Sequence, residues 1–260
     1  MFNRFLEIYK KELNKLKKIY NIIGKYYDEA DIKNPYHRDR ILFYKKFVKG
    51  KKILDYGCGE GRLAIELAKM GLEVTAVDLS SEFIKKAINY AKNENVKIKF
   101  IVGDISEIYL PKKKFETIYC CETLEHLISP YLTLIILREY LKDDGQLIIS
   151  VPNSCNIKRI IYNLIGLENK YIYGKSGHFY SFDSAGIQKL LHFTGFKVIK
   201  IINYPPQIVY NNNIKGIIGK ILFKLFPKII GSIIIIAKKS FKNHWNYIYP
   251  EIKEELKNEF

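Results

Sequence analysis

The fold is decided by the stretch Ile53-Leu54-Asp55-Tyr56-Gly57-Cys58-Gly59-Glu60-Gly61-Arg62. Its first residues predict an apolar strand that ends in an acid, and its alternate glycines predict a turn into a helix over residues 63–70. Glycine has no Cβ and tolerates positive φ, so this turn can bring bare backbone close to a ligand. A second predicted strand, 74–77, ends at Asp78, which follows Gly59 by 19 residues. That spacing is typical of a strand–turn–helix–strand unit that places a carboxylate on a ribose.

The turn does not complete the dinucleotide-binding fingerprint, because Arg62 stands where that pattern has a glycine. Glu60 at the mouth of the helix also disfavours a pyrophosphate, since like charges repel. A ribose-bearing ligand without phosphates, and with a positive charge, fits these residues better. S-adenosylmethionine (SAM) is such a ligand, and at this point the sequence resembles the class I SAM-dependent methyltransferases. The resemblance covers roughly residues 35–240 and is strongest over 51–153.

Strands and helices alternate along the chain, which predicts an α/β fold with a doubly wound sheet. The resemblance implies a Rossmann-like sheet of seven strands, the last one antiparallel, with N-terminal helices as a lid. We expect a helical cap over 1–50, a SAM-dependent methyltransferase domain over 51–240 and a polar tail over 241–260. Two insertions in the domain, 153–177 and 205–228, are expected to shape the acceptor site.

The predicted cofactor residues lie at the carboxyl ends of strands, where ligands bind in open α/β sheets. The resemblance implies that Asp104 accepts a hydrogen bond from the adenine amine and that the N–H of Ile105 meets a ring nitrogen. Arg38, just ahead of the first strand, is the candidate for the SAM carboxylate, and a surface salt bridge is the alternative. The complete predicted set is Arg38, Asp55, Gly57, Gly59, Gly61, Asp78, Leu79, Asp104, Ile105 and Cys121.

A second constellation, Glu122-Thr123-Leu124-Glu125-His126, follows the fourth predicted strand. A helix that begins near Glu122 would place Glu122, Glu125 and His126 on one face. Two carboxylates and an imidazole suit Mg²⁺, Mn²⁺ or Zn²⁺. The E-x-x-E-H pattern resembles both the ubiquinone-biosynthesis O-methyltransferases and the small-RNA 3′-terminal 2′-O-methyltransferases. The second group recruits a further histidine, which implies His178 here.

Two alternatives to this metal site stay open at the level of the sequence. Glu125 can form a salt bridge instead, and many small-molecule methyltransferases carry Glu-His at this position without a metal. In that case His126 or His178 is the candidate general base. Both histidines are therefore predicted catalytic residues.

The net charge of +16 raises RNA as a partner, although the lysines are scattered through every segment. Segment 214–228 combines isoleucines with lysines, a pattern that fits either peripheral membrane contact or packing over the acceptor site. In 153–177, Tyr162, Tyr171 and Tyr173 suit a flat or lipid-like acceptor and suit a small hydrophobic core equally well. The longest apolar run, 229–237, is too short to span a bilayer, so no transmembrane segment is predicted.

The four cysteines lack metal-ligand spacing and favour a reducing, cytoplasmic compartment. We therefore expect a SAM-dependent enzyme that methylates an oxygen of a small-molecule, glycan or isoprenoid-linked acceptor by in-line transfer. N-methylation stays open. One alternative is an RNA 2′-O-methyltransferase with a metal held by Glu122, Glu125, His126 and His178. Another is a SAM-binding regulatory protein without catalysis.

Overall fold

The computed structural model describes residues 2–26, 34–155, 166, 177–211, 213–229 and 231–240. In this part of the chain, seven strands form one sheet in the order β3-β2-β1-β4-β5-β7-β6. The first five strands pair in parallel, and β7 runs antiparallel to both β5 and β6. The predicted Rossmann-like sheet is confirmed. The strands are β1 (Lys52–Tyr56), β2 (Glu73–Asp78), β3 (Lys99–Val102), β4 (Phe115–Cys121), β5 (Leu141–Pro152), β6 (Phe196–Tyr204) and β7 (Ser232–Lys239).

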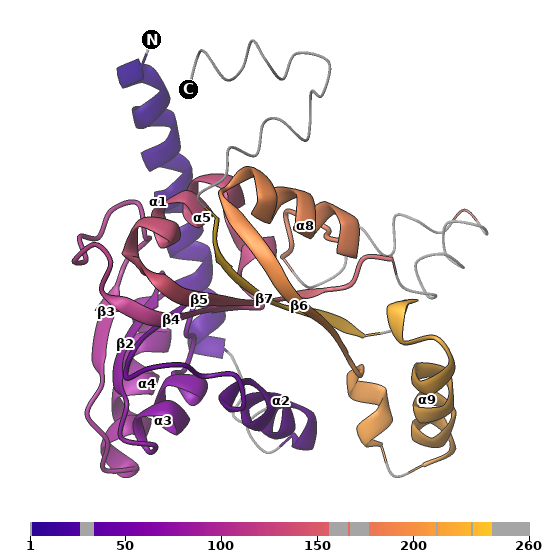
Figure 1. Cartoon of the computed structure of the whole chain (residues 1–260). Coiled ribbons are helices and arrows are strands. Elements are labelled where there is room, and N and C mark those ends of the chain that lie inside the picture. The colour runs from indigo at the N-terminus through magenta and orange to yellow at the C-terminus, as the bar shows by residue number, and fades with distance from the viewer. Residues whose placement is uncertain are drawn as a thin grey trace, which may run out of the picture.

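Helices cover both faces of this sheet (Figure 1). Figure 1 shows α5 and α8 on one side and α2, α3 and α4 on the other. The helices are α1 (Phe2–Tyr26), α2 (Pro35–Lys45), α3 (Arg62–Ala68), α4 (Ser81–Asn93), α5 (Pro130–Tyr140), α8 (Ser184–Phe193) and α9 (Ile214–Leu225). The described residues also include three short 3₁₀ helices: η2 (Leu124–His126), η3 (Gln207–Tyr210) and η4 (Pro227–Ile229). The predicted tail 241–260 and most of the predicted insertion 153–177, including Tyr162, Tyr171 and Tyr173, lie outside the described residues.

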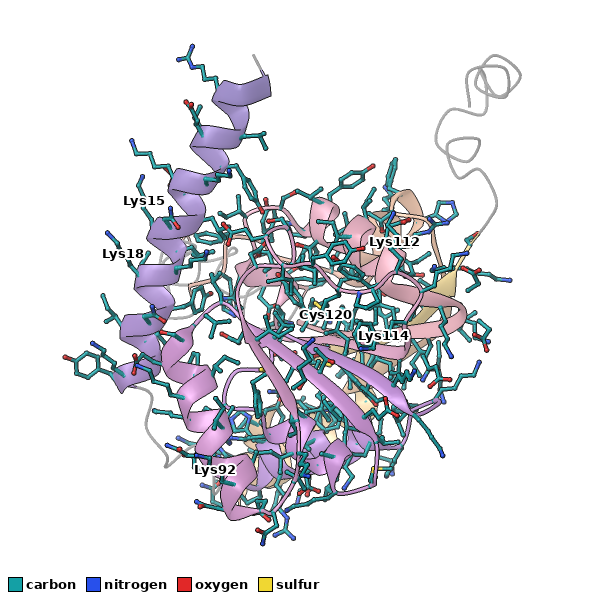
Figure 2. The ribbon with its side chains drawn as sticks, turned by 90° about the vertical axis from the view of Figure 1, so that its left-hand side faces the viewer. Lys15, Lys18, Lys92, Lys112, Lys114 and Cys120 are labelled. Atoms are coloured by element: carbon teal, nitrogen blue, oxygen red, sulfur yellow. The ribbon has the colours of Figure 1, made fainter. Side chains whose placement is uncertain are left out.

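The core consists of two layers because successive strand side chains point to opposite faces. Leu54 and Ile149 pack on the side of α5 and α8, whereas Ile53 and Ile148 pack on the side of α2 and α3. All four side chains are fully buried. Strands covered on both faces have continuous apolar sequences, which is why these segments were recognisable as strands. In Figure 2, Cys120 lies inside the body of the fold, whereas Lys15 and Lys18 project outward from α1.

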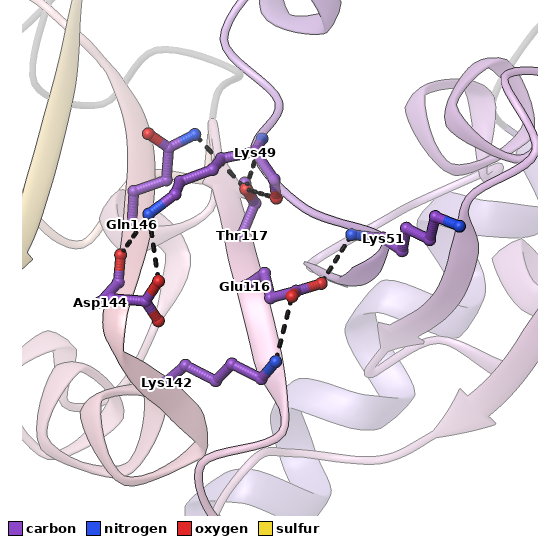
Figure 3. Close-up of polar contacts among 7 residues, drawn as sticks. All are labelled: Lys49, Lys51, Glu116, Thr117, Lys142, Asp144 and Gln146. Carbon is purple, nitrogen blue, oxygen red and sulfur yellow. Dashed lines mark hydrogen bonds and ion pairs between the residues drawn. The ribbon is translucent and has the colours of Figure 1, made fainter.

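The linker between α2 and β1 is fastened to the sheet by Thr117 of β4 (Figure 3). The Thr117 hydroxyl donates to the Lys49 carbonyl at 2.7 Å and accepts from the Lys49 N–H at 2.9 Å. Beside it, the Glu116 carboxylate accepts from the Lys51 N–H at 2.6 Å and pairs with the Lys142 ammonium at 3.0 Å. These contacts fix where α2 meets the sheet, and α2 supplies part of the site described below.

Among the helices that the structure describes, none is both long enough and apolar enough to cross a membrane.

Candidate functional site

The glycine turn between β1 and α3 is tied to the end of β2. The N–H groups of Gly57 and Cys58 donate to the Val77 carbonyl at 2.8 and 3.0 Å. The N–H of Gly59 donates to the Asp78 carboxylate at 2.8 Å. Gly59 has a φ of 53°, and a Cβ built there would meet no atom within 4 Å. The backbone of Gly59 therefore borders open space, as expected for a position that a ligand approaches closely.

At Gly61, the need for glycine comes from helix packing rather than from a ligand. Its φ is 75°, and a Cβ at this position would lie 2.9 Å from the Cβ of Ala87 on α4. This is tighter than side-chain carbons pack, so Gly61 allows α3 to approach α4.

Three acids stand at the carboxyl ends of β1, β2 and β3, in three different environments. Asp55 is buried, and one of its oxygens has no hydrogen-bond partner among the described residues. Burial, reinforced by the Asp78 charge, raises the pKa of Asp55 to about 7. Asp78 accepts two backbone N–H groups at 2.8 Å each. Asp104 accepts from the Tyr56 hydroxyl at 3.0 Å. Asp55 is thus the acid that a cationic ligand group would stabilise most.

A cavity of about 750 Å³ opens at this edge of the sheet. Helix α1 forms one wall, and Leu13, Leu16 and Tyr20 are among the residues that it contributes. The cavity also gathers most of the predicted cofactor residues: Asp55, Gly57, Gly59, Asp78, Leu79, Asp104 and Cys121. Ile105 is buried behind it, and its N–H donates to the Tyr56 hydroxyl at 3.5 Å. The predicted adenine contact of Ile105 stays a prediction.

Of the two arginines on α2, Arg40 lines the cavity and the predicted Arg38 does not, while Arg62 of α3 also lines it. Arg38 is exposed and is not among the residues that line the cavity. Arg40 does line the cavity, and its guanidinium lies 3.2 Å from the Glu122 carboxylate. The cause is helix geometry, since residues two positions apart on α2 point in different directions. The entry into α2 is fixed by Asn34, whose side chain accepts from the Tyr36 N–H.

The prediction that a helix begins near Glu122 is wrong. Glu122 has a φ of 52°, in the left-handed region that non-glycine residues seldom adopt. Its N–H donates to the Ser150 carbonyl at 2.9 Å, and its carboxylate accepts from the Ser150 hydroxyl at 2.8 Å. The helical turn that follows is η2, which begins at Leu124. Glu122 is therefore bonded to Arg40 and Ser150 rather than aligned with Glu125 and His126.

The structure does bring Glu125, His126 and His178 together. Among the described residues, these three form a group in which one ligand atom from each lies within 4.8 Å of the others. Glu122, the fourth predicted ligand, does not belong to it. The segment that carries His178 is held here because the N–H groups of Phe179 and Tyr180 donate to the Glu125 carbonyl at 2.8 and 3.2 Å.

The chemistry of this trio suits a divalent cation. Glu125 is buried, and neither carboxylate oxygen has a hydrogen-bond partner among the described residues. Burial raises the pKa of Glu125 and lowers the pKa of both His126 and His178. Imidazoles that stay neutral near pH 7 can bind a metal or accept a proton. The Nδ1 of His126 lies 3.3 Å from the Gly177 carbonyl, a partner that can orient the ring.

Only one of the two histidines borders the cavity. His126 lines it, as does Tyr20, whose ring meets that of His126 edge-on with centroids 6.0 Å apart. His178 packs behind His126. The sequence predicted a helical cap over residues 1–50 but not which of its side chains would reach the site, so Tyr20 on α1 and Arg40 on α2 were missed.

The predicted insertion 205–228 packs against α2. None of the described residues of this segment lines the cavity. Instead, Tyr210 of η3 packs against Tyr36 of α2, with ring centroids 5.6 Å apart. The segment therefore supports the helix that carries Arg40.

Comparison with known proteins agrees with this geometry. A family described as "Methyltransferase domain" matches residues 28–201. The ubiquinone biosynthesis O-methyltransferase of Coxiella burnetii is 36% identical over 46% of this chain and 51% of its own length, so the chain spans about half of that relative. The protein of the same name from Rickettsia canadensis is 32% identical over 73% of this chain and 84% of its own length. A magnesium protoporphyrin IX methyltransferase from Synechocystis, solved with S-adenosylhomocysteine (SAH), has a TM-score of 0.56 at 20% identity, over 78% of this chain and 84% of its own.

Proposed function

The chain belongs to the class I SAM-dependent methyltransferase family, and we propose that it transfers a methyl group to a hydroxyl oxygen of a small acceptor with an apolar body. The observation that carries this proposal is the single cavity that joins the glycine turn and Asp78 to His126. One end offers the groups that suit SAM, and the other offers a neutral imidazole beside apolar side chains. The names of the Coxiella and Rickettsia relatives support an oxygen acceptor.

The proposed reaction is an in-line displacement. A lone pair of the acceptor oxygen forms a bond to the methyl carbon, while the bond from that carbon to sulfur breaks and its electron pair stays on sulfur. SAH leaves, and the hydroxyl proton passes to a base. His126 is the proposed base because it lines the cavity and burial keeps it neutral near pH 7. The main contribution of the protein is alignment of the two reactants.

For SAM itself, we propose that Asp78 accepts from the ribose hydroxyls and that Asp55 faces the positively charged methionine end. Arg40 takes the role predicted for Arg38, toward the SAM carboxylate. Asp104, Leu79 and Cys121 complete the walls. We propose that α1 acts as a cap, since its apolar side chains Leu13 and Leu16 are buried against the site.

A divalent cation fits Glu125, His126 and His178, because a buried carboxylate that has no hydrogen-bond partner among the described residues lies beside two neutral imidazoles. When bound there, such an ion would act as a Lewis acid and lower the pKa of the acceptor hydroxyl. With or without it, the His178 ring and the Gly177 carbonyl contact the ring of His126 and can hold it in place. Of the three ions that the sequence suggested, Zn²⁺ and Mn²⁺ suit a set of one carboxylate and two imidazoles better than Mg²⁺, which prefers oxygen ligands.

The acceptor class is proposed from the apolar wall. Ile19 and Ile23 of α1, Ile41 of α2, Ile128 and Phe179 border the cavity. This wall suits an aromatic or lipid-linked hydroxyl better than a glycan. We propose the cytoplasm as the compartment, as the cysteine spacing in the sequence favours.

Transfer of a labelled methyl group from SAM tests the proposal. The acceptors are a panel of alkyl-substituted phenols and catechols, a lipid extract and bulk RNA. We expect label in the apolar hydroxyl compounds and SAH as co-product. Label in RNA, with RNA binding that weakens steeply as salt rises, would favour the RNA 2′-O-methyltransferase instead. SAM binding without turnover on any acceptor would favour the regulatory alternative.

A further inference from the structure

Helix α9 turns its two glycines inward and most of its large apolar residues outward. Its buried residues are Gly216 and Gly219. A Cβ on Gly216 would clash with the Asn211 backbone, so this glycine lets the helix pack closely. The exposed apolar side chains of this region are Ile214, Ile217, Ile218, Ile221, Leu225 and Phe226, each about half exposed or more.

The exposed apolar residues of α9 form one stripe. At about 100° per residue, positions 214, 217, 218, 221 and 225 share a face, and that face lies opposite Gly216 and Gly219. Lys215, Lys220 and Lys224 are exposed and fall along the flanks of the stripe. An apolar face flanked by lysines is the arrangement of helices that lie in a membrane interface.

The charged side chains in the sequence around α9 are positive. From 184 to 250 the chain contains no Asp and no Glu. Lysines recur throughout this stretch, at 189, 197, 200, 215, 220, 224, 228, 238, 239 and 242. A protein-binding apolar patch does not require this bias, whereas an anionic lipid surface attracts it.

The position of α9 relates it to the cavity. It follows the carboxyl end of β6 at Tyr204. Ser232 of β7 pairs both with Tyr204 and with Pro152 at the carboxyl end of β5, so these two strand ends lie at the same edge of the sheet. Helix α9 therefore stands at the sheet edge where the cavity opens. It contacts η3, and Tyr210 of η3 packs on Tyr36 of α2, the helix that also carries Arg40.

We propose that the outer face of α9 (Ile214, Ile217, Ile218, Ile221 and Leu225, with Lys215, Lys220 and Lys224) docks on the surface of an anionic lipid bilayer. The apolar side chains enter the boundary between headgroups and acyl chains, and the lysines stay at the headgroups. This surface is defined without reference to the reaction, so it can be tested apart from methyl transfer. If the acceptor is lipid-linked, docking would present the cavity edge to the membrane that holds it.

The test is co-sedimentation of the full chain with vesicles of phosphatidylcholine alone or mixed with phosphatidylglycerol. We expect partition into the mixed vesicles and much weaker binding to the neutral ones. The variant Lys215→Gln/Lys220→Gln/Lys224→Gln should bind roughly 100-fold more weakly, since each lysine near an anionic surface contributes about fivefold. The variant Ile217→Ser/Ile221→Ser should bind the mixed vesicles at least roughly tenfold more weakly, because it removes apolar area that would be buried in the membrane. The matched control Lys15→Gln/Lys18→Gln/Lys92→Gln changes charge equally and should bind as the unchanged chain does.

SAH affinity, measured on every variant, shows that each is folded. Binding that survives the isoleucine changes but follows the lysines would be plain electrostatic adsorption and would overturn the proposal. Equal loss in the matched control would do the same. If the unchanged chain is a dimer that dissociates in the isoleucine variant, a second copy of the chain occupies this face and the proposal is overturned. If the unchanged chain binds RNA but not vesicles, and the lysine variant loses that RNA binding, the proposal is overturned as well.

Discussion

The imidazole rings of His126 and His178 pack edge to face with centroids 4.6 Å apart, beside the buried carboxylate of Glu125. The two histidines lie on either side of a long insertion, and backbone hydrogen bonds from Phe179 and Tyr180 to Glu125 hold them together. A buried carboxylate without a hydrogen-bond partner is costly. A protein keeps such a group where a cation or a substrate completes it.

Removal of one member of this trio should weaken metal binding. Titration of the chain with Mn²⁺ or Zn²⁺ is expected to show one saturable site. Glu125→Ala and His178→Ala should each lower that affinity at least tenfold, because a partly assembled donor set binds a cation weakly. His192→Ala on α8 is the matched histidine control. Absence of a saturable site in the unchanged chain, or equal affinity in Glu125→Ala, would remove the metal from the account.

Substitution of Arg40 and of Arg38, both on α2, tests which arginine binds the SAM carboxylate. Arg40→Ala should weaken SAH binding about tenfold, since a charged hydrogen bond to the ligand carboxylate is lost. The same change should leave binding of 5′-methylthioadenosine unaltered, because that compound lacks the carboxylate. Arg38→Ala should change neither affinity. Equal losses for both ligands would mean that Arg40 acts only through its ion pair with Glu122.

Asp55 should make SAM binding depend on pH. Burial raises its pKa to about 7, so the ligand-free protein holds a proton there at pH 6 that it has released by pH 8. SAM affinity should therefore rise over this range, with proton release on binding below pH 7. Calorimetric titration of SAM in buffers that differ in ionisation enthalpy measures the number of protons released on binding. A flat affinity profile in the unchanged chain would contradict this assignment.

The raised pKa of Asp55 also predicts how the stability of the ligand-free protein depends on pH. Its folded value lies above the value of an unfolded aspartate, so the folded state binds more protons between about pH 4 and pH 7. The free energy of unfolding contributed by this group therefore falls as pH rises through that window. Asp55→Asn should raise the melting temperature of the ligand-free protein at pH 8 and weaken SAM binding there. A lower melting temperature would show that the charged carboxylate is stabilising.

Thr117 tests the attachment of α2 to the sheet. Its buried hydroxyl bonds both the N–H and the carbonyl of Lys49. Thr117→Val keeps the shape but leaves those groups unpaired, so urea unfolding should show a loss of about 1–3 kcal/mol. Thr117→Ser keeps the hydroxyl and should lose less. A smaller loss in Thr117→Val than in Thr117→Ser would show that the methyl group, and not the hydroxyl, matters here.

Local patterns were enough to predict the sheet and the cofactor edge. Asp55 and Asp78 end strands whose apolar runs are visible in the sequence, and the glycine turn between them has a fixed geometry. The wall made by α1 and α2 depends on side-chain direction over long separations, and Arg40 was missed in favour of Arg38 for that reason. The helix expected at Glu122 failed because Ser150 and Arg40, distant in sequence, hold that residue in a left-handed conformation.

The most direct test of the central claim is calorimetric titration of SAH into the unchanged chain and into Asp78→Ala. Asp144→Ala, an exposed acid at the other edge of the sheet, serves as the control. We predict one molecule of SAH per chain, roughly 100-fold weaker binding in Asp78→Ala because charge-assisted hydrogen bonds to the ribose are lost, and no change in the control. Failure of the unchanged chain to bind SAH, or equal affinity in Asp78→Ala, would contradict the account.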